Sequence, residues 1–479
     1  MLYGWQTDHQ FPNKHRSMKQ YDAIIIGSGQ AGTPLARKLA AKGWKVVIIE
    51  KQFAGGTCIN YGCTPTKTMV ASAKNAFQAR RAMEYGVRVE NISIDMPAII
   101  ARKNKVVTEF RGGTERGLGS NANITLVYGV ASFSGHKQVS VALNNGGTEE
   151  YTAEHIFINT GGRTAIPAID GIADVPYLTS TTILDVTTVP EHLLIIGGSY
   201  IALEFGQMFR RYGSQVTILE HSSRFLPKED QDVADEMQKI LTEEGITIHL
   251  GVPIKKVGYD AGKAIAVTAT IDGKEQILTG SQLLLAAGRV PNTNQLNLGK
   301  TGVTIDERGY IQVNDQLETT VPGIYALGDV KGGPAFTHIS YNDYLVVYKN
   351  IIENANISIK NRMVPYCMFT DPELGRVGLN EDEAKKKGVR FTVAKLPMAY
   401  VARGIETGET RGFMKAIVDP DTRQLLGVSI LGAQGGELMS LLQIAMLGGV
   451  TYEQLKENIF AHPTYSESIN NLFMSLDNQ

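Results

Sequence analysis

Two of the chain's three cysteines, Cys58 and Cys63, lie within residues 55–67 (GGTCINYGCTPTK). At this spacing a strand-to-helix turn brings the sulfurs within bonding distance, and the first turn of a following helix favours a thiolate. We therefore expect a redox-active disulfide. Two buried structural thiols or half of a zinc site are the alternatives. A structural zinc normally takes four Cys or His ligands at tighter spacing, however, and the sequence contains no second pair.

A histidine and a carboxylate flank a turn in residues 459–467 (IFAHPTYSE). An imidazole oriented by a carboxylate is suited to moving a proton to and from a leaving thiolate. Most histidines are structural or simply exposed, so this pattern alone does not indicate catalysis. It indicates an acid–base role only in a chain that also has a redox disulfide. His462 and Glu467 are accordingly candidate acid–base residues. The third cysteine, Cys367, falls in an apolar strand-like segment at residues 365–369, and we expect it to be buried.

The segment that precedes the cysteine pair has the pattern of a dinucleotide-binding turn. Residues 21–32 (YDAIIIGSGQAG) form an apolar strand that runs into a full G-x-G-x-x-G and a predicted helix through residue 40. A second strand, residues 45–49, ends at Glu50. Gly27 makes the tight turn, Gly29 lets the backbone approach a pyrophosphate, Gly32 allows close helix packing, and Glu50 can accept from ribose hydroxyls.

A second segment repeats this layout. Residues 193–204 (LLIIGGSYIALE) again predict a strand, a turn and a helix, but Ser199 and Ala202 stand where the second and third glycines would be, after Gly197. The next strand, residues 215–219, ends at Glu220. Two dinucleotide modules in one chain suggest one permanently held flavin nucleotide and one exchanging nicotinamide nucleotide. The alternative is a single cofactor and a decayed repeat.

The remaining segments complete the organisation. Strand-like residues 137–143 and 265–271 are followed by glycine turns and predict antiparallel ribbons. Residues 323–329 (GIYALGD) place Asp329 after an apolar strand, where the carboxyl edge of a sheet meets a ligand. From residue 364 the pattern predicts an α+β module, with strands at 365–369, 390–396, 413–418 and 426–431 and a helix at 438–447.

Composition narrows the class of protein. The 479 residues imply two to four domains, and Lys+Arg 47 against Asp+Glu 48 gives no electrostatic reason to expect nucleic-acid or membrane binding. Three cysteines in so long a chain favour a reducing compartment, so we expect a cytoplasmic protein. Residues 1–18 lack the apolar core of a signal peptide and are expected to form a flexible extension.

Together these motifs resemble, in order and over residues 18–476, the class I pyridine nucleotide-disulfide oxidoreductases, which include dihydrolipoamide dehydrogenase, glutathione reductase and mercuric reductase. The resemblance implies an α/β fold with two Rossmann-like dinucleotide-binding domains and a C-terminal α+β interface domain that forms a homodimer. We expect an FAD-binding domain at residues 19–160 and 281–349, an NAD(P)H-binding domain at 161–280 and a dimerisation domain at 350–479.

The resemblance also assigns roles to residues. It makes Cys58 the interchange thiol, Cys63 the flavin-contacting charge-transfer thiol, and His462 a base supplied by the partner chain and oriented by Glu467. Lys67 and Glu204 match an ion pair beside the reactive flavin nitrogen, and Tyr200 matches the side chain that covers the nicotinamide pocket. The full set of expected FAD and NAD(P)H positions comprises Gly27, Gly29, Gly32, Glu50, Gly56, Thr57, Lys67, Thr160, Gly161, Gly197, Ser199, Tyr200, Ile201, Glu204, Glu220, Gly288, Arg289, Gly328 and Asp329.

The electron acceptor is less constrained. The second nucleotide motif resembles that of mercuric reductases, but residues 475–479 lack the terminal cysteine pair with which those enzymes hand over Hg(II). Residues 225–230, 410–412 and 462–473 resemble the bacterial reactive-chlorine-resistance branch, which is linked to Cu(II) reduction. We expect a thiol-reactive metal ion, Hg(II) or Cu(II), or a disulfide as substrate, and no resident metal. Dihydrolipoamide dehydrogenase is the alternative enzyme, and a flavin-bound oxidant sensor is the alternative of another class.

The nicotinamide preference follows from opposing charges. Glu220 accepts from a free ribose hydroxyl and repels a 2'-phosphate, which favours NADH. Ala202 and the nearby Arg224 point toward NADPH. The sequence favours NADH without excluding NADPH.

Overall fold

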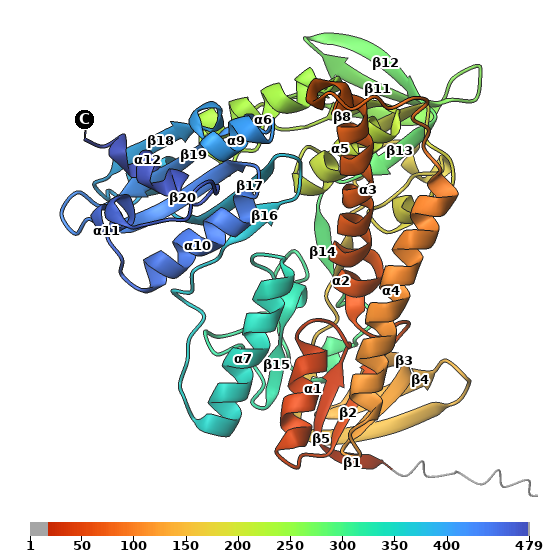
Figure 1. Cartoon of the computed structure of the whole chain (residues 1–479). Coiled ribbons are helices and arrows are strands. Elements are labelled where there is room, and N and C mark those ends of the chain that lie inside the picture. Colours follow the sequence, from red (N-terminus) through yellow and green to blue (C-terminus); the bar gives the residue numbers. More distant parts are fainter. Residues whose placement is uncertain (1–17, 478–479) are drawn as a thin grey trace, which may run out of the picture. The chain divides into compact units, whose positions relative to one another are not determined.

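The computed structural model describes residues 18–477 (Figure 1). These residues form two compact units. The first comprises the chain up to Gly56, Gly113–Gly161 and Pro291–Ile359; the second comprises Thr57–Gly112, Gly162–Val290 and the chain from Lys360. Apart from Met18, the extension expected at residues 1–18 lies outside the described residues. The four-part domain division inferred from the sequence stays a prediction.

The first unit is built on a six-stranded sheet. β1 (Lys19–Ile26) pairs in parallel with β2 (Val46–Glu50) and β5 (Thr148–Ile158), while β15 (Ile324–Ala326) continues the parallel part beside β5. β3 (Ile124–Gly135) lies parallel to β2, and β4 (Gln138–Leu143) is antiparallel to both β3 and β5. Helices α1 (Gly32–Ala41) and α7 (Thr337–Glu353) pack on this sheet, with 3-10 turns at Leu298–Lys300 and Gly328–Lys331. The predicted strand, turn, helix and second strand are thus confirmed.

Burial on both faces explains why the second half of β1, residues 23–26, is an unbroken apolar run. Ile24 and Ile26 belong to one core cluster, whereas Ala23 and Ile25 belong to another with Leu35 of α1. Successive side chains of a strand point to opposite faces, so a parallel strand covered on both sides has to be apolar throughout. The strand therefore ends where the apolar run ends, at the glycine turn.

The second unit begins with two helices that follow each other almost directly in the sequence. α2 (Gly56–Tyr61) and α3 (Cys63–Arg81) are separated only by Gly62, and 3-10 residues Ala82–Tyr85 follow. The strand-to-helix turn expected between Cys58 and Cys63 is wrong, because both cysteines lie in helices. Pro65 explains the interruption: it is tolerated in the first turn of α3, but its ring would clash with the carbonyl four residues earlier in a continuous helix. α4 (Met96–Gly119) follows in the chain.

A four-stranded parallel sheet in order β13, β7, β8, β9 forms the next part of this unit. Its strands are β7 (His192–Ile196), β8 (Gln215–Leu219), β9 (Ile246–His249) and β13 (Gln282–Leu285), with helices α5 (Tyr200–Tyr212) and α6 (Gln231–Glu243) between them. A ribbon of β10 (Ile254–Tyr259), β11 (Ile265–Ile271) and β12 (Lys274–Gly280) is antiparallel, as predicted for residues 265–271. Two short strands, β6 (Gly162–Thr164) and β14 (Arg289–Pro291), pair with each other.

The C-terminal part is an antiparallel sheet in order β16, β17, β20, β19, β18. Its strands are β16 (Tyr366–Met368), β17 (Glu373–Gly378), β18 (Thr392–Pro397), β19 (Phe413–Val418) and β20 (Leu425–Gly432). The helices are α8 (Glu381–Lys386), α9 (Ala402–Glu406), α10 (Gly435–Leu447), α11 (Tyr452–Glu457) and α12 (Ser468–Met474). The α+β prediction is confirmed, although β17 was missed. Between residues 18 and 477, no helix is both long and apolar enough to span a membrane.

Candidate functional site

The first glycine turn, in the first unit, has no room for side chains. Gly27 has a φ of +102°, and a Cβ there would lie 2.4 Å from the carbonyl oxygen of Asn159, just after β5. A Cβ on Gly32 would lie 2.2 Å from the Gly27 carbonyl oxygen. Only glycine fits at both positions. The turn therefore offers bare backbone at the start of α1, the arrangement that accommodates a pyrophosphate.

Glu50 is buried at the carboxyl end of β2 and holds this turn in place. One carboxylate oxygen accepts from both the Ser28 backbone N–H at 3.1 Å and the Ser28 hydroxyl at 2.7 Å. The other accepts from the Gln52 backbone N–H at 2.9 Å. A carboxylate can accept about four hydrogen bonds, so one site is left for a ribose hydroxyl. The ribose role of Glu50 stays a prediction.

The other expected positions of this unit lie after neighbouring parallel strands. Thr160 follows β5, and its hydroxyl donates to the Asn292 carbonyl at 2.9 Å. Gly328 follows β15, and its N–H donates at 2.8 Å to the fully buried carboxylate of Asp343, a residue that the sequence reasoning missed. The carboxyl ends of parallel strands share one edge, where ligands of such sheets bind. That edge carries Gly27, Gly29, Gly32, Glu50, Gly56, Thr160, Gly161, Gly328 and Asp329.

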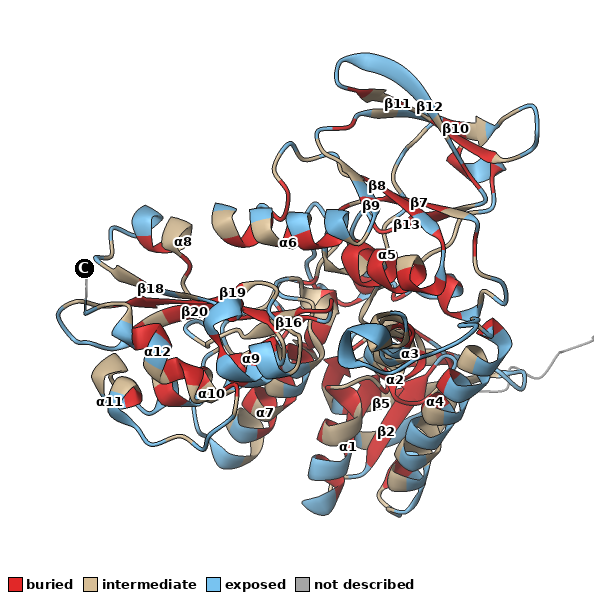
Figure 2. Ribbon diagram, turned by 45° about the horizontal axis from the view of Figure 1, so that its top comes forward, coloured by how far each residue is buried: buried red, intermediate tan, exposed pale blue. Residues whose placement is uncertain are grey.

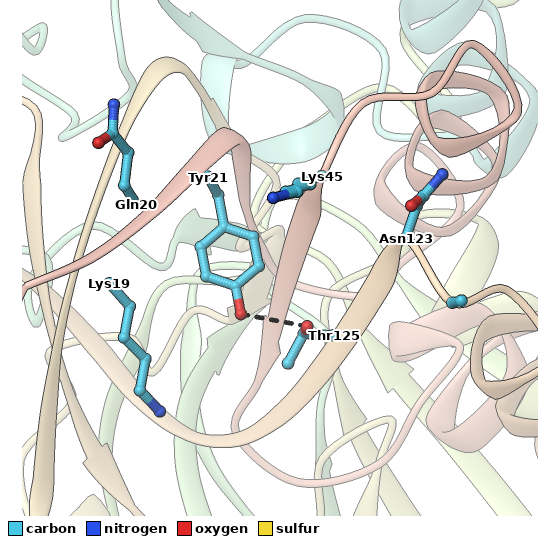
Figure 3. A pocket seen from close by; sticks show the side chains of 7 residues that line it. Lys19, Gln20, Tyr21, Lys45, Asn123 and Thr125 are labelled. Atoms are coloured by element: carbon cyan, nitrogen blue, oxygen red, sulfur yellow. Dashed lines mark hydrogen bonds between the residues drawn. The ribbon is translucent and has the colours of Figure 1, made fainter.

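A pocket of about 340 Å³ lies at the opposite, amino-terminal edge of the same strands (Figure 3). It is lined by residues that include Lys19, Lys45 and Thr125, and the Tyr21 hydroxyl and that of Thr125 are 3.1 Å apart. None of the expected cofactor residues lines it. This pocket is therefore separate from the edge of the sheet that carries the residues expected to bind the cofactor.

The second glycine turn, in the second unit, reproduces the first with different side chains. Gly197 has a φ of +105°, and its Cβ would lie 2.5 Å from the Ala286 carbonyl oxygen. Ser199 is the extended residue before α5, and Ala202 is fully buried. Glu220 accepts from the Gly198 N–H through one oxygen and from the Ser222 N–H, at 2.7 Å, through the other.

The remaining positions expected to bind the nicotinamide nucleotide lie around this turn. Tyr200 and Ile201 open α5, while Gly288 and Arg289 follow β13. The Arg289 guanidinium donates to the Gly162 carbonyl at 2.8 Å. Arg224, which the sequence suggested as a contact for a 2'-phosphate, instead donates to the Glu229 carbonyl at 2.7 Å and to Asp382 at 3.1 Å.

The cysteine pair occupies two helix starts. Cys58 is the third residue of α2 and half-buried, whereas Cys63 is the first residue of α3 and exposed. The first turn of α3 contains no acidic residue. The positive end of the helix dipole therefore acts on Cys63 without a competing carboxylate and favours its thiolate.

The predicted pair of Lys67 and Glu204 is formed. The Lys67 ammonium lies 2.6 Å from the Glu204 carboxylate, which is 4% exposed, and 4.8 Å from the centre of the Phe369 ring. The other Glu204 oxygen accepts from the Phe369 backbone N–H at 2.9 Å. Lys67 comes four residues after Cys63 on α3, so a single helix carries both the thiol and the cation.

His462 and Glu467 also form the predicted pair. The Nδ1 of His462 lies 2.9 Å from both carboxylate oxygens of Glu467, and the His462 side chain is 71% exposed. The hydrogen bond to Glu467 and its negative charge raise the pKa of His462 above its usual value. The imidazole is thus oriented through Nδ1 by a carboxylate that also stabilises its protonated form.

Cys367 departs from its prediction. It lies in β16, but it is half-buried rather than buried. Burial, together with the charges of Glu373 and Glu204, raises the pKa of its thiol. The thiol is therefore a poor nucleophile and unlike the helix-start cysteines.

Sequence and structure comparisons establish the class of this protein. Residues 21–343 match the family described as pyridine nucleotide-disulphide oxidoreductase, and residues 364–473 match its dimerisation domain. The chain belongs to this family. It is an FAD-dependent NAD(P)H oxidoreductase with two Rossmann-like domains and a C-terminal α+β domain.

Individual members of the family are similar to this chain over nearly its whole length. The chain is 39% identical over 460 residues to the probable pyridine nucleotide-disulfide oxidoreductase RclA of Escherichia coli, covering 95% of this chain and 99% of RclA. It is 34% identical to mercuric reductase of Lysinibacillus sphaericus (95% and 83% covered) and 36% identical to dihydrolipoyl dehydrogenase of Thermus scotoductus (94% and 96%). A solved Cu(II) complex of E. coli RclA, an HOCl-induced flavoprotein disulfide reductase, superposes with a TM-score of 0.88 at 38% identity, covering 95% of this chain and 99% of that one.

Proposed function

We propose that this enzyme passes electrons from NAD(P)H through FAD and the Cys58–Cys63 pair to a thiol-reactive metal ion, with Cu(II) as its first candidate. The observation that carries the proposal is the cysteine pair at the starts of α2 and α3, in a chain similar over nearly its full length to a protein solved with Cu(II). Thiolates are the ligands that soft ions such as Cu(I) prefer.

The two glycine turns have the form that a dinucleotide needs, so the cofactors fit the residues present. The edge that carries Gly27 and Glu50 would hold FAD, and the turn that carries Gly197 and Glu220 would hold NAD(P)H. When bound, FAD supplies a two-electron carrier between a hydride donor and a disulfide. Arg224 is engaged by Asp382 and the Glu229 carbonyl, and this supports NADH over NADPH.

The cysteine pair would cycle between disulfide and dithiol. One NAD(P)H and one proton supply two electrons and two protons, which convert the disulfide into two thiols and leave NAD(P)⁺. Two Cu(II) ions then each accept one electron, two protons are released, and the disulfide re-forms. In this scheme Cys58 contacts the acceptor, and Cys63, held as a thiolate by the start of α3, is the flavin-facing sulfur.

A disulfide substrate is the second candidate, and the pair of His462 and Glu467 favours it. Reduction of a disulfide releases a thiolate that needs a proton, and a carboxylate-oriented imidazole supplies one. A metal ion needs no such proton. Retention of this pair is consistent with the similarity to dihydrolipoyl dehydrogenase.

We further propose that the enzyme is a cytoplasmic homodimer in which the partner supplies His462. The match to a dimerisation domain over residues 364–473 supports this. That part of the chain also exposes large apolar side chains, with Ile444 at 70%, Leu447 at 69% and Ile459 at 95%. Large apolar side chains that are this exposed, in a segment that matches a dimerisation domain, are consistent with a surface that a second copy covers.

A panel of acceptors tests the proposal. The purified enzyme is given NADH or NADPH under anaerobic conditions with Cu(II), Hg(II), lipoamide or glutathione disulfide. We expect fast metal-dependent oxidation of NADH and little disulfide turnover. Fast lipoamide turnover with slow metal reduction would instead make the enzyme a dihydrolipoamide dehydrogenase. A single reductive half-reaction without turnover for any acceptor would indicate a sensor.

A further inference from the structure

One face of α5 binds the backbone that follows β16. Glu204, Gln207 and Arg211 are spaced three and four residues apart, so they share one side of the helix, and each is 4% exposed. All three bond to the segment from Phe369 to Asp371. Figure 2 shows α5 as a largely buried helix. The sequence reasoning assigned a role to Glu204 alone.

Gln207 binds Asp371 as another strand would. Its amide nitrogen donates to the Asp371 carbonyl at 2.8 Å, and its amide oxygen accepts from the Asp371 N–H at 2.8 Å. Both polar groups of one buried peptide residue are satisfied by one side chain. This two-point contact fixes the orientation of the segment as well as its distance from α5.

Arg211 adds an ion pair at the same residue. It donates to the Asp371 carboxylate at 2.7 Å and to the Asp371 carbonyl at 3.2 Å, while Lys74 of α3 lies 3.1 Å from the other carboxylate oxygen. Burial raises the pKa of Asp371, but the charges of Arg211, Lys74 and Arg411 outweigh it and hold the pKa at about 2. Asp371 is therefore ionised and tied to both α3 and α5.

Phe369, two residues before Asp371, contacts both members of the Lys67–Glu204 pair. Its N–H donates to Glu204, whose other oxygen binds Lys67, and Lys67 also lies against the Phe369 ring. The placement of the pair thus depends on where the Phe369 backbone sits. That backbone is itself held through Asp371 by Gln207 and Arg211.

We propose that Gln207 and Arg211 are positioning residues for the hydride-accepting centre: they fix the Phe369–Asp371 backbone so that Glu204 keeps Lys67 in place. This rests on the proposed function and on the role beside the flavin that the family resemblance implies for Lys67 and Glu204. The competing explanation is a buried polar network that only stabilises the fold. The positioning role and the purely stabilising role differ in one respect: only in the first does Gln207 affect the flavin through Glu204.

The test combines Gln207→Met with Glu204→Gln and the double variant. Gln207→Met keeps the side-chain volume and removes both hydrogen bonds to Asp371, together with the one that Gln207 donates to Glu244 at 3.0 Å. Gln231→Met, at an exposed position that starts α6, is the control. The rate of flavin reduction by NADH is measured by anaerobic stopped flow, together with the visible spectrum and midpoint potential of the bound flavin. Amide hydrogen exchange of residues 369–371 reports on the segment itself. Because no terminal acceptor is added, the outcome is independent of whether metals or disulfides are the substrate.

We expect Gln207→Met to slow flavin reduction roughly tenfold and to alter the flavin spectrum and potential, with faster exchange at residues 369–371. In the double variant the rate should fall no further than in Glu204→Gln alone, because interacting residues are not additive. If Gln207→Met does not fold, Gln207→Asn, which keeps the amide but shortens its reach, replaces it.

Three results would overturn the inference. Faster exchange at residues 369–371 with a normal flavin rate, spectrum and potential would show a purely structural network. Losses that multiply in the double variant would show that Gln207 does not act through Glu204. A Glu204→Gln variant with wild-type flavin behaviour would refute the role of the ion pair and this inference with it, while leaving the choice of electron acceptor open.

Discussion

The two nucleotide-binding turns have nearly the same backbone and different packing. Gly27 and Gly197 have φ values of +102° and +105°, and a Cβ on either would come within 2.4 or 2.5 Å of a carbonyl oxygen at the end of the neighbouring parallel strand. In both turns a carboxylate at the end of the next strand, Glu50 or Glu220, accepts from the N–H of the residue that follows the first glycine. The constraint on the main chain is thus shared.

The difference lies in what fills the space beneath the turn. In the first module the Asn159 side chain donates to the Gly27 carbonyl at 3.3 Å, and a Cβ on Gly32 would lie 2.9 Å from its amide nitrogen. In the second module, Ala286 stands where the first has Asn159. Ala202 stands where the first has Gly32, and its side chain is fully buried. Glycine is required at position 32, because a Cβ there would meet the Asn159 amide nitrogen and, at 2.2 Å, the Gly27 carbonyl oxygen.

Adding one methyl group to the first module should change the protein most. Gly32→Ala should cost about 3 kcal/mol of unfolding free energy and release FAD, because the Cβ meets backbone that cannot move aside. The reverse change in the second module, Ala202→Gly, should cost only about 1 kcal/mol, the helix penalty of glycine. FAD content and thermal denaturation measure both. Equal losses of stability and of FAD at the two positions would contradict the difference in packing between the two turns.

A second effect is confined to the loop after β8. Burial raises the pKa of Glu229 to about 7, with Asp230 and Glu383 adding to the rise and Arg376 opposing it. The Tyr366 hydroxyl donates to one Glu229 oxygen. The folded protein therefore retains a proton that the unfolded chain loses near pH 4.5, so stability falls as the pH rises from about 5 to 8.

Glu229→Gln removes this loss, so its stability relative to the wild type should rise by roughly 2–3 kcal/mol between pH 5 and 8. Chemical denaturation across that range measures it. Parallel pH profiles for the wild type and Glu229→Gln would contradict the assignment.

The strand-end acids should affect different cofactors. Glu220→Gln removes the charge that repels a 2'-phosphate and should improve NADPH relative to NADH about tenfold in kcat/KM, a change of about 1.4 kcal/mol. FAD content should not change. Glu50→Gln should do the opposite and weaken FAD retention while leaving the nicotinamide preference intact. If Glu220→Gln lost FAD, the modules would be wrongly assigned.

The smallest effect is expected from restoring the missing glycine. Ser199 immediately precedes α5, and Ser→Gly at such a position costs only a few tenths of a kcal/mol. Ser199→Gly should therefore change the KM for NADH less than about threefold. Steady-state kinetics measure this change. A tenfold loss would mean that the Ser199 hydroxyl itself contacts the nucleotide.

Local patterns were enough to predict both modules, because each glycine, acid and apolar strand is read from adjacent residues. The same holds for β11 and β19, whose bounds match the predictions. The helical setting of Cys58 was missed, since it depends on how Pro65 interrupts a helix rather than on spacing. Gln207, Arg211 and Asp371 were also missed. Their contacts join residues more than 150 positions apart in sequence, and no local pattern records such a pairing.

The most direct test of the electron path is anaerobic, Cu(II)-dependent NADH oxidation by Cys58→Ser, compared with that of the wild type. Both proteins are also assayed with a one-electron artificial acceptor in place of Cu(II). The path through the cysteine pair predicts that the variant keeps its FAD and its artificial-acceptor flux and loses the metal-dependent flux. Cu(II)-dependent flux equal to that of the wild type would show that the metal takes its electrons elsewhere, and the proposed thiol relay would be wrong.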